Sequence, residues 1–316
     1  MPSYRRAVVL LKGFLGDAVM ATPLLEGLRG QFSTVVVAPP AIGSLLGESW
    51  RDSFFPVLGR GLLPRVSALR KAHADIAFVL NRSFRSALSV RVAGIGVRVG
   101  HAAERRGFLL THQVQFDERR HETESALDLA RAVGIELAPM QPMLRLTDGE
   151  LARGRELLGG ADFALQPGAR HEYKRLPPET LAELVPMLLD AGLTPVLVGG
   201  SEEVEAAAAL QSAFPKLRNL VGECSLRETM GLLAASRLTL GADTGILHIA
   251  AAVGCPTVTV FGPTEHATRW GHLYAPHQVL QAGPEGMGSV SAQSIFEAAK
   301  LATERGPREP STARST

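Results

Sequence analysis

Short apolar runs alternate along the chain with longer stretches in which apolar residues recur every three or four positions. The runs are rich in β-branched residues, as strands buried on both faces are, and the longer stretches have helical periodicity. Alternation of this kind favours parallel sheets that are covered by helices on both sides. We predict strands at Val8–Leu11, Val35–Ala38, Ile76–Leu80, Phe163–Gln166, Thr194–Val198, Leu238–Leu240 and Thr257–Phe261.

The pattern of elements is interrupted once, between residues 139 and 148, where Pro139, Pro142 and Thr147 precede a new helical stretch from about Gly149. We interpret this segment as a linker between two doubly wound α/β halves that face each other across a cleft. The predicted domains are residues 1–147 and 148–304. The polar, Pro-containing segment 305–316 is expected to be a disordered tail.

Length and composition agree with two soluble domains, because the chain has 316 residues, of which 46% are hydrophobic. The formal charge of +2 calls for no nucleic acid, and Cys224 and Cys255 have no metal-ligand spacing, which fits a reducing compartment. The apolar run Ala7–Leu11 is shorter than the roughly seven residues of a secretion signal, and no stretch reaches the roughly eighteen of a spanning helix. We expect a cytoplasmic protein that can contact the inner membrane from that side.

The most informative stretch is Ser236–Pro263, which joins two predicted strands through a polar turn and a helix. Asp243 is placed to cap this helix, and Thr244 and Gly245 put small residues where exposed backbone N–H groups would face a ligand. His248 lies one helical turn after Thr244 and can share that face. A capping aspartate and a core histidine are the simpler alternative, but capping alone does not require this combination. We therefore predict a phosphate site.

A second strand-to-helix turn opens the chain, where the first predicted strand leads through Gly13 and Gly16 to Asp17 and a helix expected over Ala18–Arg29. The spacing matches neither a dinucleotide-binding fingerprint nor a Walker loop. Asp17 would begin a helix and face the cleft, where a carboxylate can act as a general base. The spacing leaves an ordinary capping aspartate equally open.

Two loops of the second half also follow predicted strands. The first carries Arg170, Lys174 and Arg175, and such basic side chains suit an anionic group, although a solvated loop is the alternative. The second contains Glu202 and Glu203, and an acidic side chain in this place can accept hydrogen bonds from ribose hydroxyls. The alternative is a glutamate that merely favours the start of the next helix.

Arginine is concentrated in one part of the first half. Against a nearly neutral chain, this local excess predicts an anionic partner, and a solvated face balanced by nearby acidic residues is the alternative. The candidate acceptor-binding residues in this part are Arg82, Arg85, Arg98, Arg105 and Arg106, with His101, Arg119, Arg120 and His121 nearby.

Taken together, these segments resemble glycosyltransferase family 9, the ADP-heptose:lipopolysaccharide heptosyltransferases, from about Ala7 to Trp270. Five patterns occur in the family's order, and their succession is more specific than any one of them. They are similar to Gly13–Asp17 with Thr22 and Pro23, Asn81–Ala87 with Gly94–Gly100, Gln166–Ala169 with Lys174, Gly199–Glu203, and Asp243–Ala251 followed by Phe261–Thr264.

The resemblance implies a GT-B fold of two Rossmann-like domains, with the acceptor bound mainly by the first and the nucleotide-sugar by the second. It implies an inverting transfer of heptose from ADP-L-glycero-β-D-manno-heptose to the inner core of lipopolysaccharide, on lipid A–Kdo or a heptosyl acceptor, without metal or other cofactor. Matched by residue, Asp17 would be the general base, Lys174 a pyrophosphate ligand and Glu203 a ribose or adenine-side contact. The diphosphate cradle would be formed by Asp243, Thr244, Gly245 and His248.

The chain departs from the family pattern at two positions, and two alternatives to heptose transfer stay open. Leu176 stands where the family often has Trp, and Cys224 stands where it has Met near the adenine. A transferase that uses another activated sugar or acceptor, and a nucleotide-binding protein without transfer activity, both agree with the residues. The position of the added heptose, the oligomeric state and the extent of domain closure are not encoded in any motif.

Overall fold

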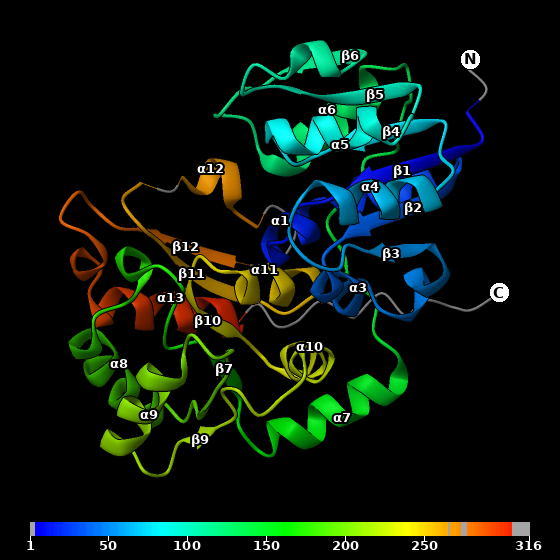
Figure 1. The fold of residues 1–316 in the computed structure, drawn as a ribbon. Helices are drawn as coiled ribbons and strands as arrows, with labels where there is room; N and C mark the ends of the chain where they lie inside the picture. The colour runs from blue at the N-terminus through cyan, green and yellow to red at the C-terminus, as the bar shows by residue number, and fades with distance from the viewer. Residues whose placement is uncertain (1–3, 265, 273–276, 305–316) are drawn as a thin grey trace. The chain divides into compact units, whose positions relative to one another are not determined.

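The computed structural model describes residues 4–264, 266–272 and 277–304 (Figure 1). The chain divides into two compact units, Met1–Pro142 and Met143–Thr316, and the division falls inside the segment expected to be a linker. Within the described ranges, no helix is both long and apolar enough to cross a membrane. The expected disordered tail, residues 305–316, lies outside the described residues.

The first unit is built on a six-stranded sheet in the order β3-β2-β1-β4-β5-β6, and every pair of neighbouring strands is parallel. Its strands are β1 (Arg6–Leu10), β2 (Ser33–Ala38), β3 (Phe54–Pro56), β4 (Ile76–Val79), β5 (Val97–Ala102) and β6 (His112–Gln115). Its helices are α1 (Leu15–Met20), α2 (Thr22–Arg29), α3 (Pro40–Leu46), α4 (Leu62–Lys71), α5 (Phe84–Val92) and α6 (Glu122–Arg131), with 3-10 turns η1 (Glu48–Ser53) and η2 (Gly107–Leu109).

The second unit repeats this design with a parallel sheet in the order β12-β11-β10-β7-β8-β9. Its strands are β7 (Phe163–Leu165), β8 (Pro195–Leu197), β9 (Arg218–Asn219), β10 (Thr239–Ala242), β11 (Thr257–Phe261) and β12 (His277–Gln281). Its helices are α7 (Asp148–Leu158), α8 (Pro178–Asp190), α9 (Val204–Ala213), α10 (Leu226–Ala235), α11 (Gly245–Ala252), α12 (Ala267–Trp270) and α13 (Ala292–Glu304), with 3-10 turns η3 (Glu172–Lys174) and η4 (Met287–Ser289).

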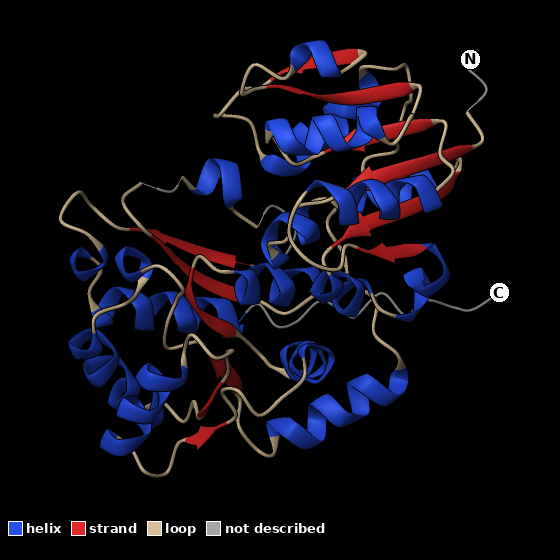
Figure 2. Ribbon diagram, viewed as in Figure 1, coloured by secondary structure: helices blue, strands red, loops and turns tan. Residues whose placement is uncertain are grey.

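Both sheets are covered on two faces, as the sequence predicted (Figure 2). In the first unit, Val8 and Leu10 point to the face that α4 and α5 cover, and Ala7 and Val9 point the other way. In the second unit, one face of the sheet packs on α8, α9 and α13, while α10 lies against α7 and α11. Each unit therefore has its own core.

The two sheets have the same topology, because numbering each from its first strand gives the order 3-2-1-4-5-6 in both. In this order the first three strands extend the sheet in one direction, and the fourth is added on the opposite side of the first, so the switch lies between β1 and β4 in one unit and between β7 and β10 in the other. Ligands of such folds bind beyond the carboxyl ends of the strands at this switch point. The topology therefore indicates that ligand-binding residues lie in the segments that follow these four strands.

All seven predicted strands are present, and β3, β5, β6, β9 and β12 were missed. The helix predicted over Ala18–Arg29 is wrong in detail, because α1 already begins at Leu15 and a separate helix, α2, begins at Thr22. Pro23 lacks the N–H that would bond the carbonyl of Val19, and the hydroxyl of Thr22 donates to that carbonyl instead, at 2.7 Å. Proline thus explains the break.

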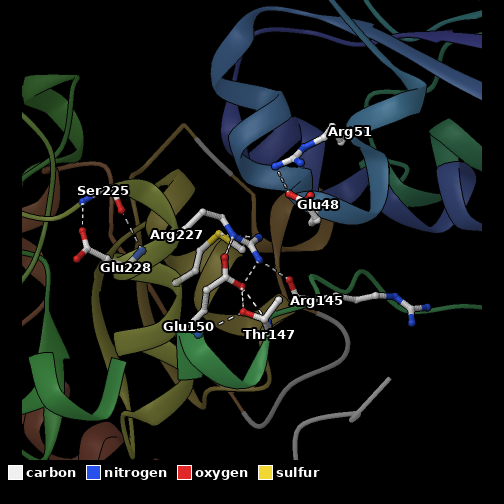
Figure 3. A network of polar contacts seen from close by, with 9 residues as sticks. Glu48, Arg51, Arg145, Thr147, Glu150, Ser225, Arg227 and Glu228 are labelled. Atoms are coloured by element: carbon white, nitrogen blue, oxygen red, sulfur yellow. Dashed lines mark hydrogen bonds and ion pairs between the residues drawn. The ribbon is translucent and has the colours of Figure 1, made fainter. Parts of the chain in front are cut away.

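The first turn of the second unit is held by a polar network (Figure 3). The Arg227 guanidinium of α10 donates to both carboxylate oxygens of Glu150, at 2.7 and 2.6 Å, and to the backbone carbonyl of Arg145 at 2.8 Å. Glu150 also closes a capping box with Thr147, the residue that precedes α7. These bonds fix the segment that enters the unit, and the hydrogen bond from Arg227 lowers the pKa of Glu150.

Candidate active site

In the second unit, the two turns at the switch point bring together residues that lie far apart in the sequence. Gln166 follows β7 directly, and Asp243 follows β10. The Thr244 hydroxyl donates to the side-chain oxygen of Gln166, and the Gln166 amide donates to Glu203 Oε1 at 3.3 Å. Gln166 therefore connects the Asp243 turn to the loop after β8, a role that its motif alone did not reveal.

Asp243 is a buried carboxylate with two basic partners. Its Oδ2 accepts from Lys174 Nζ at 2.9 Å, and its Oδ1 lies 3.4 Å from Nε2 of His248. Burial alone would raise the pKa of Asp243, but the hydrogen bond from His248 and the nearby charges of His248 and Lys174 outweigh burial and hold this pKa at about 2. The side chain is therefore a fixed negative charge that orients a lysine and a histidine.

The prediction that Asp243 caps the following helix is wrong. Thr244 occupies the N-cap position, and neither it nor Asp243 makes a side-chain capping bond. Asp243 pairs with Lys174 and His248 instead. A buried carboxylate without a basic partner would cost several kcal/mol of stability, so the ion pairs take precedence over a capping bond. The first amides of α11, which begins at Gly245, have no acceptor within the helix and are available to an anion.

Glu203 lies at the N-cap of α9 and is 5% exposed. Its Oε2 accepts from the backbone N–H of Gly200 at 2.7 Å, and burial raises its pKa. The loop passes close to this side chain, because a Cβ added at Gly199 would lie 2.8 Å from Cβ of Glu203, and Gly199 has a φ of 156°. Glycine is therefore required here, and the carboxylate is held from two sides by Gly200 and Gln166.

In the first unit, Asp17 lies at the start of α1, the helix that follows β1 at the switch point. It is the third residue of α1, and the N-cap position belongs to Phe14, so the alternative of an ordinary capping aspartate does not apply. Asp17 Oδ1 accepts from Lys12 Nζ at 2.9 Å, and each side chain is 15% exposed. The ion pair is thus mostly buried but still reached by solvent.

A pocket of about 340 Å³, counting space open to solvent, lies against this ion pair and is lined entirely by the first unit. Its polar lining residues are Lys12, Asp17, His101 and Glu122. Sequence reasoning missed Lys12 and Glu122 as site residues. Lys12 stands two positions after β1 and could have been suspected from its place at a strand end, but nothing in the local sequence marks Glu122.

The five candidate acceptor arginines divide into two groups. Arg85 and Arg105 are exposed, and Arg82 is partly buried in an ion pair with Glu122 at 3.0 Å. Arg98 donates to the backbone carbonyls of Ile95, Gly96 and Leu109, and the fully buried Arg106 donates to those of Asn81, Ser83 and His101. Arg98 and Arg106 therefore stabilise loops of the first unit.

Comparisons with known proteins identify the family to which the chain belongs. The sequence model of glycosyltransferase family 9 (heptosyltransferase) matches residues 65–299. The chain belongs to glycosyltransferase family 9. It is 28% identical to lipopolysaccharide heptosyltransferase 2 of Escherichia coli K12, over 82% of this chain and 83% of the relative. As a member of the family, it is a glycosyltransferase.

Solved structures agree with this family membership. The structure of E. coli ADP-heptose lps heptosyltransferase II has a TM-score of 0.81 at 25% identity and covers 95% of this chain and 99% of that one. An E. coli heptosyltransferase WaaC with ADP has a TM-score of 0.73 at 20% identity, over 94% of this chain and 99% of that chain. The predicted GT-B fold is confirmed, with two parallel six-stranded sheets.

Proposed function

We propose that this family 9 glycosyltransferase transfers a heptose, with inversion, from ADP-L-glycero-β-D-manno-heptose to the inner core of lipopolysaccharide. The observation that carries the proposal is the placement of Asp243, Lys174 and His248 at the switch point of the second unit, where α11 begins. The names of two similar proteins, lipopolysaccharide heptosyltransferase 2 and the solved ADP-heptose lps heptosyltransferase II, support an ADP-heptose donor and a lipopolysaccharide acceptor.

The donor would be held by the second unit. Lys174 and the amides at Gly245 neutralise the diphosphate, and Thr244 and His248 complete the cradle around Asp243. Glu203, whose carboxylate is already oriented by Gly200, accepts from the ribose or contacts the adenine side. A cation and helix amides near the diphosphate stabilise charge that develops as ADP leaves.

The acceptor would react beside Asp17. Its hydroxyl proton passes to the Asp17 carboxylate while its oxygen bonds to the anomeric carbon of the heptose. The bond from that carbon to the diphosphate oxygen breaks, and the electron pair leaves with ADP. Attack from the side opposite the leaving group inverts the anomeric centre. Lys12 keeps the carboxylate in place through Oδ1.

Among the arginines, Arg82, Arg85 and Arg105 would attract the anionic groups of the acceptor and the inner membrane surface that carries it. Arg98 and Arg106 support the loops instead. Reversal of Arg85 and Arg105 to glutamate should raise the acceptor KM and weaken binding to anionic vesicles. Unchanged values for both would exclude this surface.

Transfer should not depend on a metal ion, since Lys174 and the α11 amides supply the positive charge that a metal provides elsewhere. In the described part of the chain, no three His, Cys, Asp or Glu side chains are grouped as metal ligands. We expect turnover to be unchanged by excess EDTA. Activity that EDTA abolishes and a divalent cation restores would contradict this mechanism.

The direct test is to incubate the protein with ADP-heptose and defined truncated core acceptors and to weigh the products. An acceptor heavier by one heptose, with the anomeric configuration inverted, is the expected result. Product only with another nucleotide-sugar would identify a different transferase of the family. ADP binding without any transfer would identify a nucleotide-binding protein.

A further inference from the structure

The first unit carries two exposed phenylalanine rings in contact with each other. Phe84 is the first residue of α5, and Phe108 lies in η2. Phe84 is 39% exposed and Phe108 is 69% exposed, and their ring centroids lie 6.0 Å apart. A single exposed apolar side chain is ordinary, but an apolar patch with a polar rim is typical of an interaction site. We call these two residues the aromatic patch.

The aromatic patch lies at the edge of the first sheet where its strands end. Helix α5 follows β4, and η2 follows the neighbouring strand β5, which runs parallel to β4. Helix α4 contacts α5 on the same face of the sheet, and α5 contacts η2 (Figure 1). Asp17 follows β1, which pairs with β4, so the proposed base belongs to this same edge.

Basic side chains lie around the aromatic patch. Arg85 and Arg105 are exposed, and Arg65 of α4 is half-buried. Burial and the charge of Arg85 lower the pKa of Arg65, so these two guanidinium groups repel each other. Helices α4 and α5 and residues 103–109 together contain Arg or Lys at seven positions and one acidic residue, Glu104. The patch is therefore surrounded by an excess of positive charge.

Buried polar contacts hold the segments that carry the two rings. The fully buried Arg106 donates to the backbone carbonyls of Asn81, which precedes α5, and of His101 in β5. The Glu104 carboxylate accepts from the backbone N–H of Phe84 at 2.9 Å. Side chains on a preorganised backbone lose less conformational freedom when they bind. The patch is thus presented in a fixed arrangement.

We propose that the aromatic patch docks on the surface of an anionic lipid bilayer. Phe84 and Phe108 insert among the headgroups, while Arg85 and Arg105 contact lipid phosphates. Aromatic rings favour the interface between water and hydrocarbon, and an anionic leaflet attracts basic side chains. A second copy of the chain fits this surface less well, because a symmetric contact would place like charges against each other.

The inference rests on the proposed function, in which the acceptor is a lipid of the membrane. Arginines alone would attract the protein without fixing its orientation, whereas inserted rings hold one edge of the first sheet at the bilayer. Because Asp17 follows β1 at that edge, docking would bring the proposed base to the surface from which the acceptor projects.

Insertion is measured with tryptophan as a fluorescent probe. Phe108→Trp keeps an aromatic ring in the patch, and Val92→Trp, in the last turn of α5, is the matched control, because Val92 is 42% exposed. The vesicles contain phosphatidylglycerol and phosphatidylcholine in equal parts, with brominated acyl chains. We expect them to quench the fluorescence added by Phe108→Trp and to leave that added by Val92→Trp unchanged. Equal quenching of the two variants, or quenching of neither, would overturn the proposal.

Vesicle affinity is measured by cosedimentation with unbrominated vesicles of the same composition. Phe108→Ser should weaken binding about tenfold, the effect of removing one partly inserted ring, and Val92→Ser should leave it unchanged. Equal affinities of Phe108→Ser and the wild-type protein would overturn the proposal. Dimerisation of the wild-type protein that Phe108→Ser abolishes would also overturn it, by assigning the patch to a second copy of the chain.

Turnover separates this inference from the proposed function. Phe108→Ser should raise the KM for an acceptor embedded in vesicles about tenfold and leave the KM for the same acceptor without acyl chains unchanged. Equal increases for both forms would place Phe108 in the acceptor site and overturn the proposal. If the wild-type protein transfers heptose to neither form, the proposed function fails, and quenching and cosedimentation still decide the inference.

Discussion

His101 in the first unit and His248 in the second are equally buried, at 4% exposure each, and yet have opposite surroundings. His248 Nε2 lies 3.4 Å from the Asp243 carboxylate. His101 has an aromatic neighbour, Phe116, and burial, together with the positive charge of Arg82, lowers its pKa to about 4. Burial alone therefore does not decide what a histidine does.

The difference matches the task that we assign to each unit. A diphosphate needs positive charge, and the second unit holds Lys174 and His248 around one carboxylate, Asp243. A sugar hydroxyl needs a carboxylate to take its proton, and the first unit holds Asp17 at a pocket that His101 also lines. Two units of identical strand order thus carry different electrostatics at their strand ends.

The largest expected effect on stability is that of Asp243→Asn, which leaves Lys174 and His248 without their shared carboxylate. The second unit should lose about 3 kcal/mol of unfolding free energy, measured by hydrogen exchange of β10 and β11 amides. Arg237→Gln breaks an exposed ion pair in the same unit and should cost less than about 1 kcal/mol. Equal losses in the two variants would show that the Asp243 cluster stabilises the second unit no more than an exposed ion pair does.

As the pH falls, the first unit should lose stability at a higher pH than the Asp243 cluster of the second unit does. Unfolded His101 binds its proton near pH 6.5 and the folded residue only near pH 4, so the unfolded state binds more protons between these values, and stability falls as the pH falls. By pH 5 the loss should be about 2 kcal/mol. The pKa of Asp243 is also lowered by folding, but from 3.8 to about 2, so its contribution to stability should disappear only as the pH falls through that lower range.

Hydrogen exchange of β5 amides at pH 7 and pH 5 measures the effect of His101, and His101→Asn provides the control. The variant should lack the loss between these two values. An acid response of β5 that is the same in both proteins would assign it to other groups and would remove the electrostatic contrast between the two histidines.

A smaller effect is expected on donor binding. His248→Ala removes one hydrogen bond to Asp243 and should weaken ADP binding about tenfold in calorimetry, since a bond to a charged group contributes about 1.5 kcal/mol. His101→Ala removes an equally buried ring from the other unit and should leave the ADP affinity unchanged. Equal weakening by both variants would mean that ADP does not distinguish the two sites.

The inner strands of both sheets could be predicted from the sequence because both of their faces are buried. The strands β1, β2, β4, β7, β8, β10 and β11 are rich in apolar and β-branched residues and are buried at nearly every position. Among the edge strands, β6 and β12 carry mostly polar residues, β9 has only two residues, and β3 is apolar but has only three residues and ends at Pro56. β5 lies inside its sheet but contains Arg98, Gly100 and His101, whose roles depend on loops that no local pattern reveals.

The candidate site was predictable where a residue follows an inner strand. Asp243 directly follows β10, and Asp17 lies in the first turn of the helix that follows β1. The parallel topology explains why ligands bind at such strand ends. Glu122 was missed because it reaches the pocket from α6, far from Asp17 in the sequence. The capping role expected of Asp243 failed for a related reason, since local propensity favoured a cap and an ion pair with the distant Lys174 prevailed.

The central claim is that the first unit supplies the base and the second unit supplies donor binding, and Asp17→Asn tests it most directly. Turnover should fall roughly 100-fold or more, the usual worth of a general base, while the ADP affinity stays at the wild-type value. Glu48→Gln removes an exposed carboxylate of the same unit and should leave turnover unchanged (Figure 3). Wild-type turnover in Asp17→Asn, or a parallel loss of ADP binding, would contradict the account.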